Sequence, residues 1–192
     1  MKLILQIFLL YLTISLAMSS ENYTSEYQGQ ETRKIKSLSA DDIAELTKGG
    51  GWGLAKAAEL NGYPGPAHIL EMSSKIDLNE KQKTQINELF KKMKVDAKAL
   101  GIHLIRLEEK LNGHFANGSI NHENMENLVV QIQSVHSKLR LVHLSTHLQT
   151  PKILSPEQIN LYNELRGYSK DPCTNIPEGH NAKMWLKHNG CK

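Results

Sequence analysis

Residues 78–113 read LNEKQKTQINELFKKMKVDAKALGIHLIRLEEKLNG, and this stretch decides the fold. Asn79 is a favourable N-cap, and Gln82, three residues later, completes a capping box. The spacing of the apolar residues then alternates between three and four, which is typical of an amphipathic helix with a narrow apolar seam. The pattern predicts a long helix that begins at Leu78 and ends at Asn112-Gly113. Its predicted seam is Ile86, Leu89, Phe90, Met93, Ala97, Leu100, Leu104, Leu107 and Leu111.

A second helix of the same type is predicted after a short polar loop. It covers about residues 123–149, and Pro151 ends it because proline lacks the backbone N–H that a helix interior needs. Two long helices with similar seams and a short loop predict an antiparallel hairpin. Each helix alone would be marginal in water, so burial of the seams holds the pair together. The second seam is Met125, Leu128, Ile132, Val135, Leu139 and Val142.

Shorter helices are predicted on both sides of the hairpin. Before it, residues 38–77 contain three brief helical stretches and a Pro/Gly turn, NGYPGP, at 61–66. After it, Ser155 is an N-cap, Pro156 occupies the first helical position and Gln158 completes a second capping box. We therefore expect an all-α fold, with residues 78–168 as a helical hairpin domain.

The N-terminus has the pattern of a secretory signal peptide over residues 1–19. An early positive charge, an apolar run over residues 3–17 and small residues at Ala17 and Ser19 match its three regions. The alternative is a retained anchor, although the run is short for a membrane span. Residues 20–37 are polar, show no periodicity and are predicted to be a flexible leader. We expect export to the periplasm and no membrane insertion after cleavage.

The two cysteines, Cys173 and Cys191, both lie in the C-terminal segment 169–192. Because an exported protein matures in an oxidising compartment, a disulfide that closes this loop is favoured. The alternative is a metal site that also uses His180 and His188, which lie between the cysteines.

Composition and motifs disfavour two classes of function. The formal net charge is only +3, and no basic tract with interleaved aromatic residues suggests nucleic-acid binding. Gly49–Gly51 follows a helix rather than a strand, so it is not a phosphate loop. His143 and His147 lack the glutamate that completes a metalloprotease helix. We therefore expect a protein that is not an enzyme.

Three histidines on the second long helix form the candidate metal site. His136, His143 and His147 fall within about 40° of each other around the helix axis, at the edge of the seam. His143 and His147, one turn apart, are spaced to share a transition metal ion, and Zn, Cu, Ni and Co are the candidates. The alternative is a set of solvated or hydrogen-bonded histidines with no ligand role. Met93 and Met125 are expected to be core residues rather than copper ligands. The candidate third donors are His103, Asp96, Glu108, or His68 with Glu71.

Basic residues crowd the first long helix. With the acidic residues around them they can form a simple solvated face. Read functionally, a positive surface with apolar patches attracts unfolded chains by charge before contact. The candidate client-binding residues are Lys91, Lys92, Lys94, Lys98 and Arg106.

Two short segments resemble a known motif. Residues 78–82 read LNEKQ and residues 154–158 read LSPEQ, so each has leucine, a capping residue and glutamine at matching positions. This pair is similar to the LTxxQ motifs of the Spy/CpxP family of periplasmic stress proteins, which includes the metal-linked relatives ZraP and CnrX. Asn79 and Ser155 replace the usual threonine and keep its capping chemistry. The matching positions are Leu78, Asn79, Gln82, Leu154, Ser155 and Gln158.

The resemblance covers about residues 78–168 and implies a helical hairpin that forms a curved homodimer. It also implies ATP-independent holding of unfolded or envelope proteins, or modulation of envelope stress through a membrane sensor protein. A periplasmic metal sensor or metal-resistance protein is the alternative. A structural envelope protein with neither activity is the third hypothesis.

Overall fold

The computed structural model describes residues 23–168 and 172–191, which are helical and contain no β-strand. The chain divides into two units between Thr32 and Arg33. In the first unit, the described residues contain one turn of 3-10 helix, η1 (Gln30–Thr32). The predicted signal peptide lies outside the described residues. The all-α class is confirmed.

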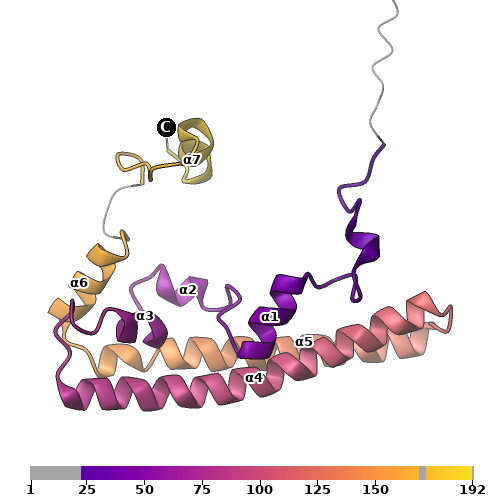
Figure 1. Ribbon diagram of the computed structural model, residues 1–192, viewed down its shortest axis with the longest axis horizontal. Helices are drawn as coiled ribbons and strands as arrows, with labels where there is room; N and C mark the ends of the chain where they lie inside the picture. The colour runs from indigo at the N-terminus through magenta and orange to yellow at the C-terminus, as the bar shows by residue number, and fades with distance from the viewer. Residues whose placement is uncertain (1–22, 169–171, 192) are drawn as a thin grey trace, which may run out of the picture. The chain divides into compact units, whose positions relative to one another are not determined.

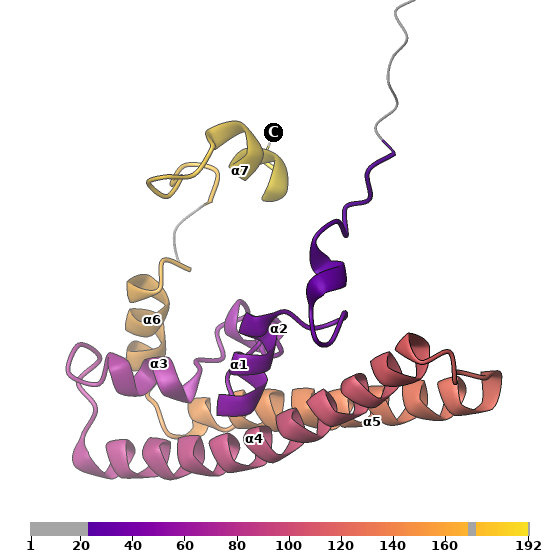
Figure 2. The ribbon, with the colours of Figure 1, turned by 45° about the vertical axis from the view of Figure 1, so that its right-hand side comes forward.

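Two long helices form the frame of the second unit. α4 (Glu80–Ala116) and α5 (His122–His147) run antiparallel and side by side, as Figures 1 and 2 both show. This confirms the predicted hairpin. The two seams meet in the core, although Leu89, Phe90, Leu100, Leu111, Met125 and Val142 are only half-buried; the other predicted seam residues are buried. They are Ile86, Met93, Ala97, Leu104 and Leu107 of α4, and Leu128, Ile132, Val135 and Leu139 of α5.

α4 continues past its predicted end. It passes through Asn112 and Gly113 without a break and stops at Asn117, where Gly118 has the positive φ of 65° typical of a helix terminus. A glycine inside a helix costs only about 1 kcal/mol relative to alanine, too little to end so long a helix. Asn112 instead makes a tertiary contact, because its side chain accepts from the Lys36 N–H and donates to the Lys34 carbonyl.

Three short helices lie along one side of the hairpin: α1 (Ala40–Lys48), α2 (Lys56–Glu59) and α3 (Pro66–Glu71) (Figures 1 and 2). The end of α1 contacts α4 backbone to backbone. A Cβ added at Gly101 of α4 would lie 2.3 Å from the Leu46 carbonyl oxygen, and one at Gly49 would lie 2.8 Å from the Lys94 carbonyl oxygen. The two glycines therefore permit this close approach.

The buried apolar residues fall into two clusters. The first joins α1, α4 and α5, and it also includes Ile35, which is only 2% exposed although it lies in the predicted flexible leader. The compact unit thus begins before residue 38, although the sequence predicted that it begins at that residue. The second cluster joins α3 and the start of α4 to α6 (Pro156–Leu165), whose Tyr162 is fully buried.

The two capping motifs are formed, and they contact each other. Asn79 with Gln82, and Ser155 with Gln158, each make both hydrogen bonds of a capping box. In addition, the Gln82 amide donates to Gln158 Oε1 at 2.8 Å, and the Gln158 amide donates to Gln82 Oε1 at 3.1 Å. The two glutamines also donate to the carbonyls of Ile153 and Asp77, respectively. We call this arrangement the glutamine pair.

Replacement of either Gln82 or Gln158 by alanine should lower the free energy of unfolding by about 1–2 kcal/mol, because each loses a cap and an inter-helix bond. The double variant should lose less than the sum of the two, since the shared bonds can be lost only once. Urea denaturation followed by circular dichroism measures both. The matched control is Gln131→Ala, since the Gln131 amide contacts only Asn127 one turn earlier in α5. Additive losses would contradict the coupling.

The C-terminal segment contains α7 (Ala182–His188) and the predicted disulfide between Cys173 and Cys191, whose Cα atoms are 5.6 Å apart. Both sulfurs are therefore used in the covalent bond rather than as metal ligands. Trp185 lies inside this loop, where its indole N–H donates to the Pro172 carbonyl at 2.8 Å and its ring meets the His180 ring edge-on.

Candidate functional site

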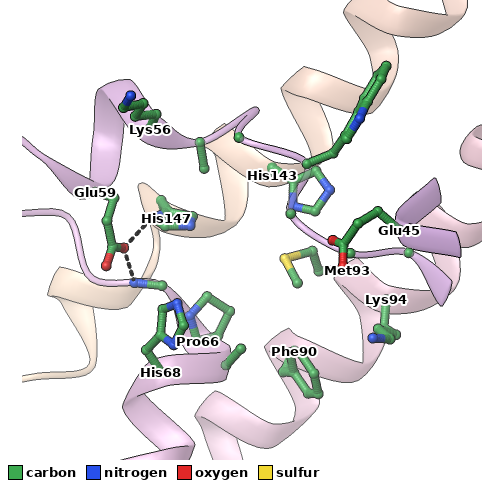
Figure 3. A pocket seen from close by; sticks show the side chains of 18 of the residues that line it. Glu45, Lys56, Glu59, Pro66, His68, Phe90, Met93, Lys94, His143 and His147 are labelled. Carbon is green, nitrogen blue, oxygen red and sulfur yellow. Dashed lines mark hydrogen bonds and ion pairs between the residues drawn. The ribbon is translucent and has the colours of Figure 1, made fainter. Parts of the chain in front are cut away.

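A cavity of about 580 Å³ lies between the N-terminal helices and the hairpin. Figure 3 shows it from close by, with side chains from α1, the α2–α3 region, α4 and α5 around it. Its lining includes Glu59, His68, Glu71, Met93, His143 and His147.

The seam of α5 changes from apolar to polar where it reaches this cavity. Within the described residues, the buried polar side chains are His143, Thr146, His147 and Thr150, which follow directly after the apolar part of the seam. The Thr150 hydroxyl donates to the Pro64 carbonyl at 2.7 Å, and His147 Nδ1 lies 2.8 Å from the Tyr63 carbonyl. The polar end of α5 and the 3-10 helix η2 (Thr150–Lys152) after it therefore hold the turn before α3 in place.

His143 differs from its polar neighbours because one of its buried ring nitrogens has no hydrogen-bond partner. It is 2% exposed, and its Nε2 is buried without a hydrogen-bond partner. Such a group costs about 1–3 kcal/mol and calls for an explanation. Burial, followed by the nearby His147 and the Lys94 ammonium, holds the pKa of His143 below its ordinary value of 6.5. The imidazole is therefore neutral at pH 7, with lone-pair chemistry available.

The lowered pKa of His143 predicts a loss of stability in mild acid. As the pH falls, His143 binds a proton at a higher pH in the unfolded chain than in the folded chain. The contribution of His143 to the free energy of unfolding is therefore fully present above about pH 6.5, and it is lost as the pH falls through the pKa of the folded state. Urea midpoints of the metal-free protein should fall between pH 7.5 and 5.5. His143→Leu should reduce this fall. Replacement of the exposed His103 by leucine is the control, and an equal reduction there would contradict the assignment.

Glu59 is the charged centre at one side of the cavity. Its carboxylate accepts from the Tyr162 hydroxyl at 2.5 Å, the Tyr168 hydroxyl at 3.2 Å and the Gly65 N–H at 3.1 Å. His147 Nδ1 lies 3.7 Å away. Burial, followed by the bond to Glu59, holds the pKa of Tyr162 well above its usual range, so this phenol stays protonated and donates. Glu59 thereby joins α2, the turn before α3 and α6.

The structure brings four of the predicted metal residues to the cavity and leaves two outside it. His68, Glu71, His143 and His147 line it, and His68 Nδ1 is 2.9 Å from Glu71 Oε2. His136 instead packs edge-on against Trp52, with 5.8 Å between ring centroids. His103 is exposed on α4.

The alternative third donors are not assembled beside the histidines. Asp96 pairs with Lys92 at 3.0 Å, and Glu108 accepts from Ser37 at 2.8 Å. Within residues 23–168 and 172–191, no three His, Cys, Asp or Glu side chains are placed to hold one metal ion.

A second candidate surface is an apolar groove of about 380 Å³ on the outer side of α5. Leu141, Leu144 and Leu148 recur at helical spacing on the face opposite the seam, and Tyr63 with α2 forms the other wall. Leu141 and Leu148 are 60% and 58% exposed. We call this surface the outer groove.

The predicted basic residues do not act as one group. Lys91, Lys98 and Arg106 are exposed on the face of α4 opposite its seam. Lys92 is paired with Asp96, whereas Lys94 is half-buried at the cavity, with its ammonium 5.7 Å from the centre of the Phe90 ring.

Sequence reasoning missed Glu59, Tyr63 and the outer groove. Glu59 lies in a four-residue helix with no periodicity, and Tyr63 contributes its backbone carbonyl, which no motif can report. The second apolar stripe of α5 was visible in the sequence, because Leu141, Leu144 and Leu148 follow a three-and-four spacing of their own.

Comparison with known proteins finds no family model that matches the chain and no similar curated protein or solved structure. None of the helices in the described ranges is both long enough and apolar enough to cross a membrane.

Proposed function

We propose that this chain is an exported, non-enzymatic binding protein of the Spy/CpxP type, which holds unfolded or envelope proteins without ATP. The observation that carries the proposal is the outer groove. Its leucines are not needed for the hairpin, because α5 buries a different set of residues against α4. The resemblance of the two capping motifs to LTxxQ supports the same class.

The chemistry of the groove suits apolar segments of unfolded chains. Single exposed apolar side chains are common on protein surfaces, but a hollow with Leu141, Leu144, Leu148 and Tyr63 along its walls is a typical interaction site. Association would remove these side chains from water, at about 25 cal/mol per Å² of apolar area. The exposed cations of α4 would add attraction to acidic clients, as charge patches raise association rates.

The test is suppression of aggregation of a chemically denatured client enzyme after dilution, measured by light scattering without ATP. We expect suppression at a few-fold molar excess of the chain. The double variant Leu141→Ser, Leu148→Ser should lose most of it while keeping its helical circular dichroism. Leu161→Ser with Leu165→Ser, two exposed leucines of α6 outside the groove, is the matched control. Absence of suppression by the parent chain would exclude the holding function.

A metal-binding sensor or resistance protein is the second candidate, and the unpartnered Nε2 of His143 favours it. Neutral imidazole nitrogens are common metal ligands. Calorimetric titration with Zn²⁺, Ni²⁺, Co²⁺ and copper ions tests this candidate. Binding should be lost in His143→Ala, and size measurement with and without metal would test the expected homodimer. Metal binding that is the same in His143→Ala would exclude the cavity.

A further inference from the structure

The donor set of the cavity indicates which metal it would take, an inference that rests on the second candidate function. Two nitrogens are available on α5. His143 Nε2 is buried and has no partner in the structure. His147 and His143 are one turn apart, so their side chains lie on the same side of the helix.

The tautomer of His147 follows from its partner. A carbonyl oxygen only accepts, so the 2.8 Å contact with Tyr63 requires the proton of His147 on Nδ1. In the neutral ring, Nε2 then carries the lone pair. An imidazole whose Nδ1–H donates to a backbone carbonyl is the usual support of a metal-ligating histidine. Gly65 beside this ring has no side chain, and a Cβ there would lie 3.2 Å from Nε2.

The third donor comes from α4. Met93 is 8% exposed, lines the same cavity and, like His143, is drawn projecting into it in Figure 3. Its thioether is a soft ligand that takes no part in hard-metal sites. Since no three His, Cys, Asp or Glu side chains of the described residues are placed to hold one metal ion, a thioether is the further donor that the cavity offers. With Met93, the cavity has three candidate ligands for one metal ion instead of two.

We propose that the cavity binds a soft monovalent ion, Cu(I), through His143 Nε2, His147 Nε2 and the Met93 sulfur. Thioethers select Cu(I), and imidazole is a good ligand for copper. Cu(I) accepts low coordination numbers, whereas Zn²⁺ prefers four ligands and Co²⁺ and Ni²⁺ commonly take more.

The test titrates the full chain under argon with Cu(I), supplied as its acetonitrile complex against a chromophoric Cu(I) chelator, and with Ag(I) as a redox-silent substitute. We expect one ion per chain. Met93→Leu, a volume-conserving change, should keep the fold and weaken Cu(I) binding at least about tenfold, as should His143→Ala. Met125→Leu is the matched control, since Met125 lies on α5 outside the cavity, and it should bind as the parent does.

The possible results distinguish the assignment of Cu(I) from metal binding in general. Zn²⁺ or Ni²⁺ binding that depends on His143, with no effect of Met93→Leu on any metal, would overturn the Cu(I) assignment and leave metal binding in place. No dependence of any metal on His143 would overturn both. X-ray absorption of the Cu(I)-loaded chain gives an independent readout, because a sulfur ligand should be present in the parent and absent in Met93→Leu.

Discussion

Glu59→Ala should lower the free energy of unfolding by about 3 kcal/mol, because it removes the acceptor at the centre of a buried network. The carboxylate is only 12% exposed. Without it, the hydroxyl of the fully buried Tyr162 loses its acceptor at 2.5 Å, and the Gly65 N–H loses the shorter of its two partners. Each unsatisfied polar group in a buried site costs about 1–3 kcal/mol. Urea denaturation at pH 7 measures the change.

Two further variants test whether the loss of stability comes from the hydrogen-bond network rather than from the removal of a negative charge. Glu88→Ala removes an exposed carboxylate of α4 and should change stability by less than about 0.5 kcal/mol. Tyr162→Phe in the Glu59→Ala background leaves no unpaired hydroxyl, but it also removes the second partner of the Gly65 N–H, so it should recover little of the loss. Equal losses in Glu59→Ala and Glu88→Ala would contradict the assigned role of Glu59.

Gly101→Ala should destabilise the protein by about 2 kcal/mol, although alanine is the better helix former. The added Cβ would lie 2.3 Å from the Leu46 carbonyl oxygen and 2.9 Å from the Leu46 carbonyl carbon. Both are backbone atoms, so no side-chain rotation relieves the overlap, and α1 must move away from α4. The steric cost therefore exceeds the gain of about 1 kcal/mol in helix propensity.

Gly113→Ala in the same helix is the matched control. A Cβ at Gly113 meets nothing within 4 Å, so only the propensity term remains, and this variant should be stabilised by up to about 1 kcal/mol. Opposite signs for the two glycines of α4, measured as urea midpoints, are the expected result. A stabilised Gly101→Ala would mean that the contact between α1 and α4 is looser than the structure has it.

The hairpin and its caps were predictable because they depend on residues close in sequence. The seam residues of α4 and α5 follow helical spacing, and the capping boxes at Asn79 and Ser155 each involve residues three positions apart. Ile35 was missed because one apolar residue in a polar segment has no periodicity. The end of α4 was predicted too early because the sequence has two Asn-Gly pairs that could end the helix, at Gly113 and at Gly118. Only packing decides which of the two ends it.

The cavity could be predicted only in part, because it depends on contacts between distant residues. The histidine pattern pointed to His143 and His147, and to His68 and Glu71 as donors from the N-terminal segment, and all four line the cavity. Angular position on a helix could not show that Trp52 covers His136. Nor could it show that Met93, which has an ordinary seam position, reaches the edge of the apolar core.

The glutamine pair has a consequence for local motion. It joins residues 76 positions apart, so the first turns of α4 and α6 depend on one another although the whole of α5 separates them in the chain. Transient breathing at either helix start would expose the amides of the other to solvent. The rates of hydrogen–deuterium exchange in these two turns should therefore change together, with the same slope, as denaturant is added.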